Sequence, residues 1–243
     1  MERLVRRGRL ALDSEYRFGF GEPCMLGKSF KADAGKAGAQ QRTSAPWGLI
    51  CMDMYGPVAP PARGGFPYVL QLVDDGTCML AVYMLRHKDE VPEAVKRFII
   101  EWVRPRGCQI QRLRGDDAAE FKGSGMQYVT PRPFGGIQLE YSTPYCHWQI
   151  GVVERGWRTL ADKTRAVMAA AGLPPQYWAF TMTYVCWLTN HLPTRVALPG
   201  CAVTPLQALE PDTAPLDLLT LHPSSCPIYV HVNDETGRTA LQA

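Results

Sequence analysis

Apolar residues along the first half of the chain come in short runs that are separated by turn residues. Runs rich in valine, leucine and tyrosine are typical of strands, and the intervening "PVAPPARGG" and "DGT" are typical of turns. Three strands in a meander are therefore expected at "LICMDMYG", "FPYVLQLVDD" and "CMLAVYML".

Helical periodicity follows these strands. Apolar residues recur at helical spacing in "KDEVPEAVKRFIIEWVRPRG", which ends in a Pro-Arg-Gly stop. A fourth strand is expected at "CQIQRLRGD", a short irregular or helical piece after it, and a fifth strand at "GGIQLEYS". Two long helices are then expected at 149–171 and 175–191. This order predicts an α/β domain with one mixed five-stranded sheet flanked by helices.

Composition divides the chain into a core and two flanking segments. Residues 1–43 have little apolar periodicity, and the residues from about 196 onward are rich in proline up to the strand-like "CPIYVHV". The hydrophobic fraction of 46% is ordinary for a packed domain, which we place at 44–195.

Charge and cysteine content narrow the class of protein. The formal net charge is only +3, so any nucleic-acid site must be a local patch. The eight cysteines form no C-x-x-C pair, which favours a reducing, intracellular compartment. No apolar run approaches the roughly 20 residues that span a bilayer, and no secretory signal is recognisable, so we expect a protein that is neither secreted nor embedded in a membrane.

Three acidic residues lie at places where sites form in α/β sheets. Asp53 is inside the first strand, Asp116 ends the fourth and Glu154 begins a helix. Each has a structural explanation when taken alone, as a turn acceptor or as a partner of the helix dipole. If the fold brings them together, they repel one another and need a cation or a proton. Hard oxygen ligands suit Mg²⁺ or Mn²⁺, and two such ions support chemistry at a phosphodiester.

The ordered motifs resemble a known family. "MDMYGPV", "LRGDDAAEF", "YSTPYCHWQIGVVERGWRTLADKTRAVM" and "LPPQYWAFTMTYVCWLTNHLPTR" are similar, in this order, to the integrase core of copia-type LTR retrotransposons. The resemblance implies the RNase H-like fold of retroviral integrases and DDE transposases. It also assigns Asp53, Asp116 and Glu154 as the catalytic, metal-binding triad, with 37 residues between the last two.

The resemblance implies that water first trims the 3′ ends of the element's DNA, and that the new 3′-hydroxyl then attacks target DNA. The implied cofactors are two Mg²⁺ or Mn²⁺ ions. The implied assembly is a homo-oligomer, and the implied location is the nucleus. Helical spacing predicts a buried stripe along the Glu154 helix and a basic side that would meet DNA phosphates. The basic residues are Arg158, Lys163 and Arg165; the stripe is Val153, Trp157, Leu160, Thr164, Val167 and Ala171.

Departures from the family pattern leave a second hypothesis open. Ile150 stands where the family has asparagine, and Asp117 stands where it has another asparagine. Residues 1–43 resemble a degenerate N-terminal zinc module and linker with too few ligands for structural zinc, and 196–243 a linker and the truncated start of a small β-barrel. Two alternatives to an active fragment of a longer polyprotein therefore stay open. One is a catalytically decayed or domesticated DNA-binding remnant, and the other is an unrelated α/β domain whose acids are structural.

Overall fold

The computed structural model describes residues 45–116, 118, 121, 123–129, 136–141, 151–194, 203–217 and 221. Each of the five runs that were expected to form strands contains one. The strands are β1 Leu49–Tyr55, β2 Tyr68–Asp74, β3 Leu80–Leu85, β4 Arg112–Gly115 and β5 Gln138–Tyr141. The helices are α3 Val91–Phe98, α5 Ser124–Val129, α6 Gly151–Ala171, α7 Trp178–His191 and α8 Pro205–Leu209.

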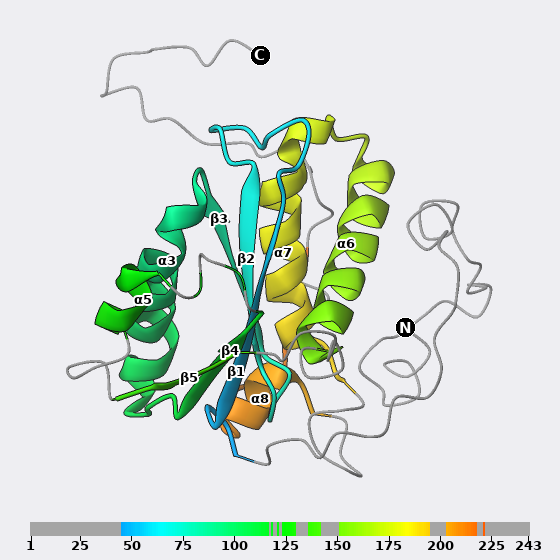
Figure 1. Cartoon of the computed structure of the whole chain (residues 1–243). Coiled ribbons are helices and arrows are strands. Elements are labelled where there is room, and N and C mark those ends of the chain that lie inside the picture. The colour runs from blue at the N-terminus through cyan, green and yellow to red at the C-terminus, as the bar shows by residue number, and fades with distance from the viewer. Residues whose placement is uncertain are drawn as a thin grey trace, which may run out of the picture.

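The five strands form one mixed sheet in the order β3-β2-β1-β4-β5. The first three are antiparallel neighbours, whereas β1, β4 and β5 run parallel. Helices α3 and α5 lie on one side of the sheet and α6 and α7 on the other (Figure 1). The prediction of an α/β fold with a five-stranded mixed sheet and flanking helices is confirmed.

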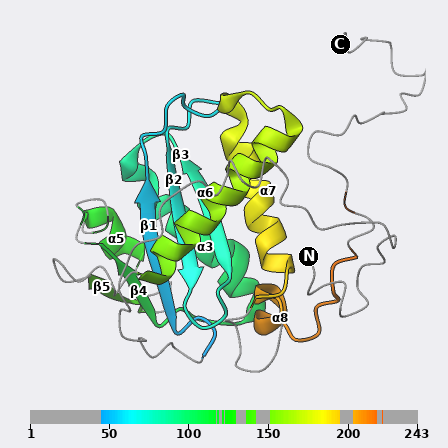
Figure 2. The ribbon, with the colours of Figure 1, turned by 90° about the vertical axis from the view of Figure 1, so that its right-hand side faces the viewer.

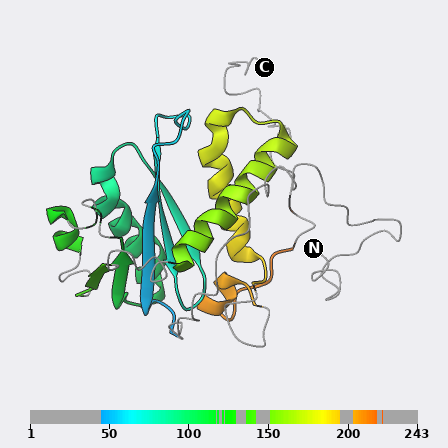
Figure 3. The same cartoon turned by 45° about the vertical axis from the view of Figure 1, so that its right-hand side comes forward.

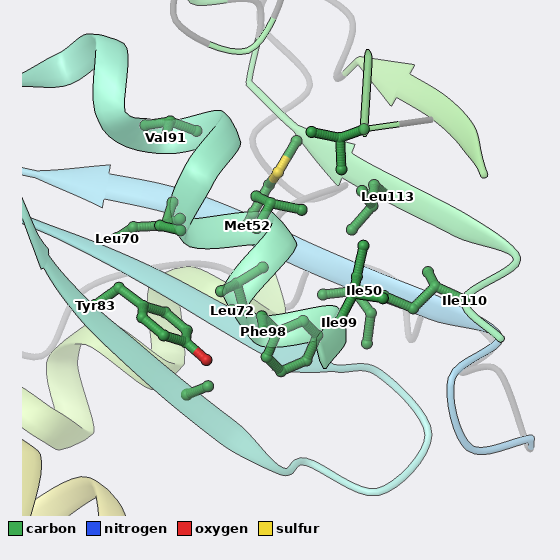
Figure 4. Close-up of a cluster of buried hydrophobic side chains, with 14 of the residues drawn as sticks. Ile50, Met52, Leu70, Leu72, Tyr83, Val91, Phe98, Ile99, Ile110 and Leu113 are labelled. Carbon is green, nitrogen blue, oxygen red and sulfur yellow. The ribbon is translucent and has the colours of Figure 1, made fainter. Parts of the chain in front are cut away.

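Alternation along the strands divides the core between the two faces of the sheet. In β1, Ile50 and Met52 pack in the cluster beneath α3, whereas Leu49 and Cys51 pack toward α6 and α7. Figure 4 shows the first cluster, where Leu72 of β2 and Phe98 of α3 join them. Figure 3 shows the helical layers on the two sides of the sheet. Every second residue of β1 therefore faces α6, and Asp53 is one of them.

The helix predicted at 88–107 is regular over only part of its length. Its α-helical turns end at Phe98; a π-helical turn, Ile99–Val103, and a 3-10 turn, Arg104–Arg106, complete it. Pro105 has no N–H to continue the ladder, and Gly107 ends the segment with a φ of +63°. Trp102, predicted in the apolar stripe, is half-buried, and the Arg106 guanidinium lies 5.2 Å from its ring centroid.

Helix α6 crosses the sheet face obliquely in Figure 2, with α7 beside it. Of its predicted apolar stripe, Val153, Leu160 and Thr164 are buried. Trp157 and Val167 are partly buried and pack against the same cluster. No helix in the described part of the chain has both the length and the apolar character that crossing a membrane requires.

A short helix lies in the segment that was predicted as a linker. Thr204 and Gln207 form a capping box at the start of α8, with Pro205 at its first position. The guanidinium of Arg106 forms a salt bridge with Glu210 at 2.7 Å, which ties the end of α8 to the turn after α3. Residues 203–217 therefore include a packed element.

Asn190 of α7 binds the backbone at the start of edge strand β3. Its side-chain Oδ1 accepts a hydrogen bond from the N–H of Leu80 at 2.9 Å, and its Nδ2 donates one to the carbonyl of Leu80 at 2.7 Å. Asn190 is 2% exposed. The amide thus satisfies backbone groups that have no neighbouring strand on this side.

Replacing Asn190 with alanine is expected to lower the free energy of unfolding by about 2 to 4 kcal/mol, because the backbone donor and acceptor of Leu80 lose their amide partner in a buried position. Chemical denaturation measures this change. Thr183→Ala, at an exposed position of the same helix, is the control and should change stability by less than about 0.5 kcal/mol. Equal effects of the two substitutions would contradict the role of the amide.

Candidate metal-binding active site

The parallel pairing of β1 with β4 places two of the predicted acids side by side. Ile50 is paired with Leu113, and Cys51 with Arg114. Two residues further along this register, Asp53 on β1 is level with Asp116, which directly follows β4. Sites of α/β proteins form at such carboxyl ends of parallel strands. The carboxylate of Asp116 accepts a hydrogen bond from the Ala118 N–H at 3.2 Å, which holds it in the turn.

Helix α6 contributes the third acid. Buried Val153 anchors the first turn of α6 against the sheet, and Glu154, the next residue, is exposed. The α6 helix contacts both β1 and β2. The charge of Glu154 reaches Asp53, since it raises the pKa of the Asp53 carboxyl. All three predicted acids therefore lie in one electrostatic neighbourhood.

The surroundings of Asp53 change its pKa. Burial, as the largest cause, raises the pKa of its carboxyl from 3.8 to about 6. The charges of Asp116 and Glu154 raise it further, whereas the hydrogen bond that Asp53 accepts from the Met54 N–H at 2.9 Å lowers it. The indole N–H of Trp157 lowers it as well, although this pair lacks the geometry of a full hydrogen bond. Such a carboxylate is relieved by a proton or by a cation.

The donor chemistry of these three carboxylates fits a hard divalent cation such as Mg²⁺ or Mn²⁺. Their spacing is looser than that of a formed site: among the described residues, no three His, Cys, Asp or Glu side chains form a group that could hold a metal ion. Glu154 differs from the other two acids in being exposed.

The three basic residues predicted to meet DNA are placed differently from one another. Arg158 and Arg165 are exposed on α6, and Arg165 forms an ion pair with Asp162. Lys163 is not on the open side: it donates a hydrogen bond to Thr189 of α7 at 3.0 Å, and burial lowers the pKa of its ammonium. The helical spacing of Lys163 did not reveal that α7 would pack against this position.

Several residues around Asp53 were not predicted as part of the site. Tyr55, two residues further along β1, is 59% exposed, and its ring centroid is 5.6 Å from that of Trp157. Gln71 of β2 is paired with Asp53 and is fully buried. Only the interruption of the apolar run "YVLQLVD" by glutamine could have drawn attention to that position in the sequence.

Some residues on which the alternative hypothesis depends lie outside the described residues. These are Asp117 and Ile150, together with the 1–43 segment and the strand-like run at 226–232. A groove of about 490 Å³ lies elsewhere, between β3, α3 and α7, and its lining includes Tyr83, Trp102 and Trp187. None of the three acids lines this groove.

Because the folded state raises the pKa of Asp53, its carboxylate destabilises the metal-free protein wherever it is ionised. The penalty is absent below about pH 4 and grows until about pH 6. Asp53→Asn is therefore expected to stabilise the protein in EDTA at pH 7.5. A tenfold change in proton affinity is worth about 1.4 kcal/mol, so the gain reaches at most about 3 kcal/mol and disappears near pH 4. Thermal unfolding across pH measures it; a loss of stability at pH 7.5 would contradict the expected penalty.

Comparison with known proteins identifies relatives. The chain is 31% identical over 147 residues to the retrovirus-related Pol polyprotein from transposon TNT 1-94 of Nicotiana tabacum, which covers 60% of the chain. It is 24% identical over 219 residues, 88% of the chain, to the truncated transposon Ty1-A Gag-Pol polyprotein of Saccharomyces cerevisiae. The matches span only 11% and 18% of those relatives. No protein-family model matches.

The fold also occurs in a solved structure. A chain in the cryoEM structure of the simian T-cell lymphotropic virus intasome in complex with PP2A regulatory subunit B56 gamma superposes with a TM-score of 0.58. The superposition covers 81% of this chain and 64% of that one, at 16% identity, and so speaks for the fold alone. The chain is therefore a relative of copia-type transposon Pol polyproteins, and its described part has an integrase-like, RNase H-like fold.

Proposed function

We propose that the chain is the catalytic segment of a copia-type integrase and performs metal-dependent phosphoryl transfer on DNA, that is, 3′-end processing and strand transfer. The observation that carries this proposal is the convergence of Asp116 and Glu154 on half-buried Asp53, whose pKa both charges raise. In the described part of the chain, the main causes of the raised pKa of Asp53 include no cation.

In this proposal Asp53, Asp116 and Glu154 hold Mg²⁺ or Mn²⁺. Bound there, the divalent ions would neutralise the carboxylates and supply Lewis-acid activation of the attacking oxygen and stabilisation of the leaving one. The sheet contributes rigidity, since Asp53 and Asp116 lie on or directly after paired strands. The helix contributes Glu154 from an exposed position next to buried Val153.

DNA would approach the exposed side of α6. Arg158 and Arg165 lie on the helix that carries Glu154, and their guanidinium groups suit phosphate oxygens. The exposed ring of Tyr55 lies beside Trp157 and two residues after Asp53, where it is available to a nucleotide near the reacting phosphodiester. A DNA substrate implies action in the nucleus and, for joining paired ends, a homo-oligomer.

The second candidate is a remnant that binds DNA without turnover. It is favoured by the absence, among the described residues, of a group of ligands close enough to hold a metal ion. The replacement of polar family positions by Ile150 and Asp117 also favours it. This remnant would keep the fold and the basic side of α6 and would lack metal-dependent cleavage.

Nicking and joining separate the two candidates. The purified full chain, given Mn²⁺, is expected to nick a supercoiled plasmid and to join to it a labelled duplex that ends in a 3′-hydroxyl. Asp53→Asn, Asp116→Asn and Glu154→Gln should each lower both activities by at least about 100-fold, because each removes a ligand charge. Far-ultraviolet circular dichroism verifies that the variants are folded. Wild-type activity no greater than that of Asp116→Asn would leave only the DNA-binding remnant.

DNA affinity tests the basic side of α6. Arg158→Ala is expected to weaken binding to a labelled duplex at low salt and to reduce the salt dependence by about one phosphate contact, whatever the sequence of the duplex. Lys163→Ala is the matched control, because its ammonium is engaged with Thr189. Fluorescence anisotropy measures both. If Lys163→Ala weakened binding as much as Arg158→Ala, the orientation of α6 toward DNA would be wrong.

A further inference from the structure

We propose that Gln71 is a positioning residue of the acid site, whose side-chain amide orients Asp53 and ties it to the helix that carries Glu154. This inference rests on the proposed function, since it assigns a role toward the same divalent cation. Gln71 does not touch the substrate in this proposal. It acts through Asp53.

The place of Gln71 in the sheet supports this role. Gln71 is the register partner of Asp53 in the antiparallel pairing of β1 with β2. Directly paired residues of neighbouring strands point to the same face of a sheet, with their β-carbons about 4.5 to 5.5 Å apart. Next to Gln71 along β2, Leu70 and Leu72 pack in the cluster under α3, on the opposite face. Gln71 therefore faces α6 together with Asp53.

The amide of Gln71 is buried and has no hydrogen-bond partner among the described residues. The residue is 0% exposed, and neither its Nε2 nor its Oε1 bonds to a group in that part of the chain. An uncharged amide in this state destabilises the fold, and an apolar side chain would fill the same position at less cost. A buried polar group of this kind requires an explanation, and one is a water or an ion that completes its hydrogen bonds in the functional state.

Helix α6 has a glycine where it packs against this amide. A β-carbon added to Gly156 would lie 2.2 Å from Gln71 Nε2. Glycine inside a helix is unfavourable relative to alanine, yet here it allows the amide to reach the backbone of α6 two residues after Glu154. The Gln71 side chain thus extends from β2, where Gln71 is paired with Asp53, to the first turns of α6, which carries Glu154.

Trp157 carries another buried donor that has no hydrogen bond within the described residues. Three of the five buried side-chain nitrogen and oxygen atoms without a hydrogen bond in the described residues belong to Gln71 and Trp157. Trp157 adjoins Gly156 on α6, and its indole N–H acts on Asp53. Donors around a ligating carboxylate orient it and strengthen its hold on a cation. We propose that Gln71 and Trp157 do this for Asp53, Gln71 from β2 and Trp157 from α6.

Gln71→Met tests the proposal, because methionine has nearly the same length and cannot form the hydrogen bonds of an amide. Mn²⁺ binding to the metal-free full chain is measured by titration calorimetry, and folding by thermal unfolding in EDTA. We expect the dissociation constant for Mn²⁺ to rise at least tenfold, while the melting temperature in EDTA stays equal to or above that of the wild type. Gln111→Met, at an exposed position, should change neither. Unchanged Mn²⁺ affinity would overturn the proposal, whatever the melting temperature.

A second pair of variants covers the case in which Gln71→Met does not fold. Gly156→Ala should displace the amide and weaken Mn²⁺ binding at least tenfold. The double variant Gln71→Ala, Gly156→Ala should recover the melting temperature of the wild type, because the β-carbon at position 156 then no longer meets the Gln71 amide. It should still bind Mn²⁺ weakly. Recovery of wild-type Mn²⁺ affinity in the double variant would show that the amide has no role.

The wild type and Asp53→Asn separate this inference from the proposed function. If Mn²⁺ binds to the wild type and not to Asp53→Asn, the acid site binds metal, and the Gln71 variants decide the inference by themselves. If Mn²⁺ does not bind to the wild type, the metal-dependent function fails, and the role of Gln71 fails with it.

Discussion

The parallel pairing of β1 with β4 is the constraint on which the rest of the site depends. This pairing puts the carboxyl ends of two strands at one edge of the sheet, so that Asp53 and Asp116 are level with each other. The two negative charges repel each other, and burial adds to the free-energy cost of ionising Asp53. The sheet tolerates the cost because its hydrogen bonds and its two apolar faces hold the strands irrespective of what the carboxylates prefer.

The two faces of the sheet differ in the side chains that cover them. The face beneath α3 is a continuous apolar cluster, in which β1 contributes Ile50 and Met52 (Figure 4). On the face beneath α6, Asp53 and Gln71 interrupt the apolar packing. At the position of α6 next to Gln71 the chain has Gly156, where a larger residue would clash with the amide. The α3 side thus has a continuous apolar cluster, whereas the α6 side includes the polar groups of the proposed site, as expected where a site requires polar groups that a core would reject.

Local patterns were sufficient for most of the elements. Alternating and apolar runs predicted all five strands, and helical spacing predicted α6 with its buried residues Val153, Leu160 and Thr164. The irregular end of the helix after Phe98 and the short helix α8 were not predicted. In both cases the conformation depends on contacts with distant segments, such as the salt bridge between Arg106 and Glu210. A local pattern does not contain such contacts.

The sequence by itself determined the fold class and the order of the elements and nominated the three acids as candidates, because periodicity and motif order are properties of consecutive residues. Only the tertiary structure decided how these residues are used. Strand register brought Gln71 beside Asp53, and the packing of α7 on α6 turned Lys163 toward Thr189 and away from the open side. Register and helix packing depend on pairs of segments far apart in the chain, and so the surroundings of the acids emerge only when the chain is folded.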